Sequence, residues 1–168
     1  MRKILITVDW INEHIGSLSR WLVAILIVLV FSDTVARYIF NAPLSFGYQS
    51  ACMLGAAIYA MFWGYVHKHH SHVRVDLLYN LLSEKGRAIL DIAFTTVFMF
   101  PLMFLFIRIS AQLTVRSYIG GEVLTESYWY PPVWPMRLVV LIGLLLLLVQ
   151  SIAEFIRDIH FAAKGERL

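Results

Sequence analysis

The sequence predicts an all-α integral membrane protein, a single domain over residues 1–168 with four transmembrane helices and short interfacial amphipathic helices. Hydrophobic residues make up 60% of the 168 residues and charged residues only 15%. Soluble domains average roughly 45–50% and about 25%, respectively. A chain this short lacks the interior volume to bury so much apolar surface, so lipid must cover the excess. The apolar residues also fall into long runs that polar links separate.

The first span is expected over residues 21–40, about the length that crosses ~30 Å of hydrocarbon. Residues 1–20 are mixed polar with apolar residues at helical spacing, which favours a short helix on the membrane surface. No signal-peptide cleavage pattern follows Arg2 and Lys3, so we expect an uncleaved first helix. The turn at Pro43 ends the first span, because proline and the residue before it disfavour helix.

The second span is expected over residues 46–66, and the short link before it predicts an antiparallel hairpin with the first. Small residues recur in this span at intervals of four, a spacing that lets helix backbones approach closely. An ordinary alanine-rich helix is the alternative interpretation. The predicted packing residues are Ala51, Gly55, Ala56, Ala60 and Gly64.

The second half of the chain also contains two long apolar runs. Residues 75–87 are amphipathic and too short and polar to cross, so they are expected at the interface. The third span is expected over residues 88–118, with a kink at Pro101, and the fourth over residues 133–153. Between these spans lies a predicted interfacial aromatic belt, made of Tyr128, Trp129, Tyr130 and Trp134.

The link between the two halves, residues 67–76, carries four of the six histidines. Lys and Arg gather here and in the two terminal segments, whereas the other two links hold Arg116 alone. The positive-inside rule therefore places both termini and the histidine-rich link in the cytoplasm. The modest net charge of +3, distributed around the apolar runs, indicates membrane orientation and no nucleic-acid partner.

Three charged residues are expected within the membrane. Asp33 and Arg37 are i, i+4 neighbours on the first span, and Arg108 reaches a similar depth on the third. A charge that faces lipid is costly, so these groups are expected to face protein. A structural cluster of all three that joins the two halves is the favoured hypothesis. Contact with a partner subunit and snorkelling of the arginines are the alternatives.

The sequence predicts no catalytic residue, no metal site and no cofactor. It has no Ser-His-Asp pattern, no phosphate-binding glycine loop and no paired carboxylates in a polar pocket. The histidine-rich link could bind Zn²⁺ or Cu²⁺, but its irregular spacing at a membrane edge favours a polar anchor. The histidines also lie outside the predicted mid-membrane region, which argues against haem held between facing helices.

The order of three motifs resembles the small membrane subunit of tripartite ATP-independent periplasmic (TRAP) transporters, the DctQ-like family. Residues 37–46 are similar to the family's arginine, F-N-x-P turn and following aromatic. Residues 72–76 resemble its H-[IV]-R-V-D signature, and residues 134–150 resemble its final P…G…LLLLQ helix. The similarity covers about the whole chain. The residues of these motifs that are candidates for partner contact are Phe46, Gln49, His72, Arg74 and Asp76.

Two of these positions depart from the family pattern. Phe46 stands where relatives usually have Trp, and Gln49 stands where they commonly have Glu. If that Glu has an ionic role in relatives, this chain lacks it, although the Gln49 amide can still form hydrogen bonds.

The resemblance implies a scaffold subunit in the bacterial inner membrane. Its partners would be a large many-span subunit with the substrate and sodium sites and a periplasmic binding protein that delivers an organic acid. The lipid bilayer would cover the rest. The alternative from another class is a membrane-anchor or electron-transfer subunit of a redox complex, which haem absorbance or bound metal would indicate.

Overall fold

The computed structural model describes residues 2–69, 83–125 and 129–165, and these ranges are helical apart from the turns. Three stretches are long and apolar enough to cross a membrane: Lys3–Ile39, Glu84–Gly120 and Trp134–Lys164. The all-α class is thereby confirmed, with three candidate membrane-spanning helices. The elements in order are α1 (Arg2–Ile39), α2 (Gly47–Lys68), α4 (Glu84–Phe94), the π-helical turn η1 (Thr95–Met99), α5 (Phe100–Gly120) and α6 (Trp134–Lys164).

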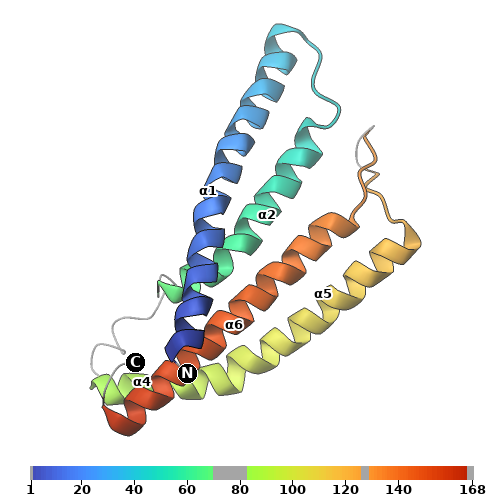
Figure 1. Ribbon diagram of the computed structural model, residues 1–168. Helices are drawn as coiled ribbons and strands as arrows, with labels where there is room; N and C mark the ends of the chain where they lie inside the picture. The colour runs from blue at the N-terminus through green and yellow to red at the C-terminus, as the bar shows by residue number, and fades with distance from the viewer. Residues whose placement is uncertain (1, 70–82, 126–128, 166–168) are drawn as a thin grey trace.

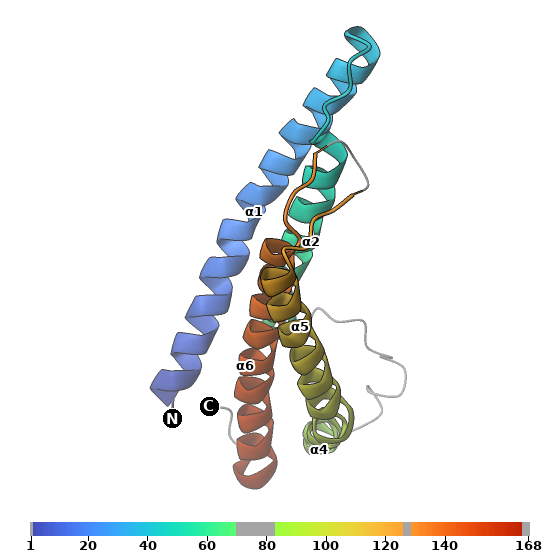
Figure 2. The same cartoon turned by 90° about the vertical axis from the view of Figure 1, so that its right-hand side faces the viewer.

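The long helices lie side by side in the order α1, α2, α6, α5 (Figure 1). Helix α2 packs against both α1 and α6, and α5 packs against α6. The links from α1 to α2 and from α5 to α6 lie at one end of the molecule, which we call the turn end. Both termini and α4 lie at the opposite end, the termini end (Figures 1 and 2). Two antiparallel hairpins therefore meet through α2 and α6.

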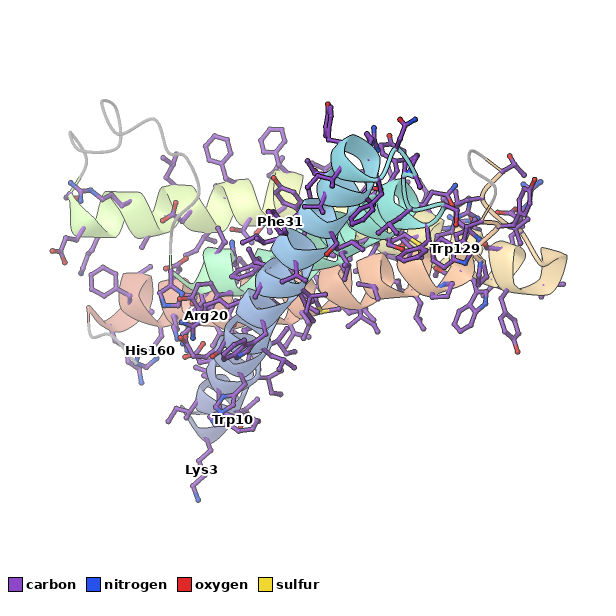
Figure 3. All side chains as sticks on the ribbon, turned by 90° about the horizontal axis from the view of Figure 1, so that it is seen from above. Lys3, Trp10, Arg20, Phe31, Trp129 and His160 are labelled. Carbon is purple, nitrogen blue, oxygen red and sulfur yellow. The ribbon has the colours of Figure 1, made fainter. Side chains whose placement is uncertain are left out.

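Helix α1 corrects the expectation of a separate surface helix over residues 1–20. It runs unbroken from Arg2 to Ile39, because no proline interrupts it and its first half is held by other helices. Gly16 lies against the ring of Tyr65 on α2, where an added Cβ would overlap that ring. Away from this contact, Trp10 is exposed and Lys3 points away from the other helices (Figure 3).

The third predicted span corresponds to α4, η1 and α5, which follow one another without a break. Pro101, the predicted kink, is the second residue of α5, and only Phe100 separates it from the π-helical turn. Proline lacks an N–H and crowds the preceding turn, so the departure from α geometry falls beside it. Of the amphipathic segment expected at 75–87, residues 75–82 lie outside the described ranges, and residues 84–87 belong to α4.

Helix α6 starts close to the predicted boundary but continues to Lys164, past the expected end at residue 153. Gly165, with a φ of 74°, then ends it in the left-handed conformation typical of a helix C-terminus. Little of the molecule is buried. Only 6% of the most apolar window of Glu84–Gly120 is covered by the rest of the chain, against 28% for α6. Helix α6 is therefore the central element, and α5 offers its surface to lipid or to other protein.

Candidate functional site

At the turn end, Asp33 organises the link between α1 and α2. One carboxylate oxygen, Oδ1, accepts a hydrogen bond from the backbone N–H of Leu44 at 3.0 Å. The other, Oδ2, forms an ion pair with Arg37 Nη2 at 2.8 Å. Gly47 leaves room for this carboxylate, because an added Cβ would lie 2.7 Å from Oδ1. Asp33 thus fixes the turn through its backbone contact, and the exposed Arg37 neutralises its charge.

Arg108 does not join this pair. It lies on the exposed surface of α5, whereas Asp33 and Arg37 lie on α1 at the far side of α2 and α6 (Figure 1). Within the described ranges, no hydrogen bond or ion pair links Arg108 to Asp33 or Arg37. The structure therefore brings together two members of the predicted cluster and places the third elsewhere.

The two departures from the family pattern lie on the first turn of α2. The ring of Phe46, the residue before α2, meets the ring of Trp129 edge to face, with centroids 6.1 Å apart. Gln49 is only 2% exposed, and neither atom of its amide has a hydrogen-bond partner among the described residues. A buried amide without partners is costly. Gln49 shares this state with the buried Ser117 hydroxyl of α5, but both polar atoms of its side chain are affected.

The predicted packing residues of α2 lie in different surroundings. Ala60 is 1% exposed and meets Gly143 of α6 so closely that a Cβ on Gly143 would overlap the Ala60 carbonyl. Gly64 is buried beside the side-chain amide of Asn12 on α1. A Cβ on Gly55, by contrast, would meet nothing within 4 Å. Ala51 and Ala56 are half-buried, so the close approach occurs in the second half of α2.

A buried polar cluster at the termini end, not predicted from the sequence, joins α1 to α6. We call it the Asp9–Arg157 cluster. Asn12 Nδ2 donates to Gln150 Oε1 at 2.9 Å, and Gln150 Nε2 donates to Asp9 Oδ1 at 3.1 Å. Arg157 binds Asp9 at 2.5 Å and Glu154 at 2.6 Å. The members are Asp9, Asn12, Gln150, Glu154 and Arg157.

A second ion pair attaches α2 at the same end. Lys68 Nζ lies 2.7 Å from Glu13 Oε2, and His69 Nε2 lies 3.7 Å from the same oxygen. No group of three or more potential metal ligands occurs in the described ranges. The candidates His72, Arg74 and Asp76 lie outside those ranges. Of the two described histidines of the link, His67 and His69, it is His69 that contacts a carboxylate of α1.

An apolar groove of about 370 Å³ lies among α2, α5 and α6. Its lining includes Trp63, Leu113 and Val140, and its accessible surface is apolar. Arg137, at the edge of the groove, forms an ion pair with Glu122 at 2.7 Å and donates to the Leu113 carbonyl at 3.0 Å. The accessible surface of the groove is apolar and its lining arginine is already paired, so it accommodates hydrocarbon better than an organic acid.

Comparison with known proteins identifies one family. The family model described as the DctQ component of tripartite ATP-independent periplasmic transporters matches residues 26–161. No curated protein and no solved structure matches the chain. The match takes in the Asp33 turn, the whole of α2, α5 and the α6 half of the Asp9–Arg157 cluster, and begins after the α1 half of that cluster.

Proposed function

This chain belongs to the DctQ family, the small permease subunits of TRAP transporters, and from that premise we propose that it is a scaffold for the subunit that moves the solute. The family is one of transporter components and not of enzymes. The observation that supports the scaffold role is where the polar side chains make their contacts. The described polar contacts between helices include those of the Asp9–Arg157 cluster, of Lys68 with Glu13 and of Arg137 with the Leu113 carbonyl, and they join helices of the chain to one another.

We propose that α2 is a fourth membrane-spanning helix beside the three long candidates. Its 22 residues extend about 33 Å, enough to cross the hydrocarbon. Its small residues allow its close contact with α6. Four crossings return the chain to the side where it started, which agrees with the common position of both termini (Figure 1).

The proposed location is the bacterial inner membrane, with the termini end in the cytoplasm and the turn end in the periplasm. The lysines and arginines of the termini and the histidine-rich link support this orientation. The proposed partners are a large many-span subunit, which would carry out sodium-coupled uptake of an organic acid, and a periplasmic binding protein that would deliver it. The turn end, with Phe46 and Trp129 in contact, would face the binding protein.

Co-purification tests the scaffold role. The chain is tagged in its native host, extracted in mild detergent, and its companions are identified by mass spectrometry. We expect a many-span membrane protein in near-equimolar amount and no haem absorbance in the visible spectrum. Recovery of a haemoprotein or a soluble dehydrogenase in its place would contradict the proposal and favour a redox anchor.

Reconstitution then tests the transport function. Vesicles that contain the large subunit, with the purified binding protein outside, should take up the solute only when this chain is also present and a sodium gradient is imposed. Uptake of equal rate without this chain would contradict the proposal.

A further inference from the structure

Helix α5 carries a line of polar side chains on the face turned away from the rest of the molecule. Arg108, Gln112 and Arg116 follow one another at intervals of four residues, and all three are exposed. We call this line the α5 polar stripe. At about 100° per residue, it points about 180° from the face that packs against α6. The buried residues that mark the packing face are Met103, Thr114 and Ser117.

Contacts with α6 show how deep the stripe lies. The ring of Tyr118 contacts the ring of Trp134 at 5.5 Å, and such aromatic residues are typical of the membrane–water boundary. Arg108 precedes Tyr118 by ten residues, or about 15 Å along the helix. That distance is about half of the ~30 Å hydrocarbon thickness. With the boundary placed at Tyr118, Arg116 is expected near it and Arg108 well inside it.

Three other arginines beside the proposed spans have acidic partners within the chain. Arg37 pairs with Asp33, Arg137 with Glu122, and Arg157 with Asp9 and Glu154. Within the described ranges, Arg108 has no hydrogen bond or ion pair. An arginine at this depth that faces lipid is costly, and such residues normally face protein and pair.

We propose that the α5 polar stripe is the surface on which a helix of the large transport subunit docks, with a carboxylate of that helix opposite Arg108. This inference rests on the scaffold function proposed above. Lipid phosphate at headgroup level can serve Arg116 but lies too far from Arg108. The amide of Gln112 needs both a donor and an acceptor opposite, which a lipid chain does not supply. A polar helix alongside α5 satisfies all three side chains.

Photo-crosslinking within the membrane tests the surface. Benzoylphenylalanine replaces Gln112 in one variant, and in a matched control it replaces Ile27 of α1, which is 63% exposed. After irradiation of native membranes, we expect a covalent product between the Gln112 variant and the large subunit, and at least about tenfold less from the control. A Gln112 variant that captures only lipid, or no more large subunit than the Ile27 variant captures, overturns the docking surface.

Charge substitution tests the role of Arg108. Arg108→Leu should lower the amount of large subunit recovered with the tagged chain by roughly tenfold, because it leaves a carboxylate unpaired in a dry interface. Arg116→Leu should lower it much less, because water and lipid phosphate replace its partner at the boundary. Unchanged melting of each isolated variant in detergent shows that folding is intact. Full recovery with Arg108→Leu overturns the docking surface.

The two proposals fail in different ways. If the unmodified chain brings no many-span protein with it, the scaffold function is wrong and the docking surface falls with it. If the unmodified chain brings the large subunit and both stripe experiments are negative, the scaffold function stands and another face makes the contact.

Discussion

The Asp9–Arg157 cluster and the α5 polar stripe use similar side chains with opposite outcomes. Each contains arginine and a glutamine. In the cluster, the chain also supplies the carboxylates of Asp9 and Glu154, and the side chains turn inward to join α1 to α6. In the stripe, no carboxylate of the described ranges pairs with an arginine, and the side chains turn outward from α5. The role of a polar residue on a lipid-covered helix therefore depends on where its acidic partner lies. Where that partner lies within the chain, the residue stabilises the fold.

The largest expected effect comes from breaking the inward cluster. Arg157→Leu removes the cation between two partly buried carboxylates, whose side chains are 24% and 13% exposed. Loss of one partner from a buried ion pair costs about 3 kcal/mol, so the melting temperature in detergent should fall sharply. Arg20→Leu, which removes an exposed arginine of α1, is the matched control, with a change within about 0.5 kcal/mol. Equal melting temperatures of the two variants would show that the cluster does not hold α1 to α6.

The next effect tests the helix contact between the two hairpins. Gly143→Ala places a methyl group against the Ala60 carbonyl and should lower the free energy of unfolding by about 2 kcal/mol. Gly55→Ala provides the control, because its Cβ meets nothing within 4 Å. That change should be neutral or stabilise by about 0.5 kcal/mol through helix propensity. If the two glycines respond alike, α2 and α6 do not approach as closely as described.

A smaller effect separates the two contacts of Asp33. Asp33→Ala removes the acceptor for the Leu44 N–H and should cost about 1 kcal/mol. Asp33→Asn keeps an oxygen acceptor and loses only the pairing with Arg37, which is 54% exposed, so its cost should be about 0.5 kcal/mol or less. Chemical denaturation of both variants measures the difference. An Asn variant as unstable as the Ala variant would mean that the charge, and not the turn contact, stabilises this end.

The smallest effect on stability is expected in the α5 polar stripe. Arg108→Leu in the isolated chain should change the free energy of unfolding by no more than about 0.5 kcal/mol, as for surface substitutions without a partner in the fold. The measurement is thermal melting of the purified chain without its companions. A loss comparable to that of Arg157→Leu would contradict the contrast between the two regions.

Hydropathy predicts which part of a helix lipid covers and says less about where the helix itself ends. The first and fourth spans were predicted at 21–40 and 133–153, whereas α1 starts at Arg2 and α6 continues to Lys164. The apolar run reports where lipid covers a helix, and not where its backbone hydrogen bonds stop. Here both helices extend beyond their apolar runs, because the Asp9–Arg157 cluster gives their polar ends a partner in each other.

Local spacing predicted local contacts only. The Asp33–Arg37 pair follows from the i, i+4 rule, and it is present. Placing Arg108 beside it required knowing which helices are neighbours, and α2 and α6 lie between. Asp9 and Arg157 are 148 residues apart, so spacing along the chain could not pair them. The available signal was polarity: Asn12 and Gln150 are amides that flank apolar runs, where a buried partner is expected.

The π-helical turn Thr95–Met99 sets the rotational phase of everything that follows it. A π turn accommodates one more residue than an α turn, so deletion of a single residue there would restore α geometry. The chain beyond would then rotate by about 100° and shift by about 1.5 Å relative to α4. Ala88 would keep its buried position, while Thr114 and Ser117 would leave the α6 contact and Arg108 would swing toward the flank of the bundle. This turn therefore sets the rotation of α5 about its axis, and with it the residues that α5 exposes to its surroundings.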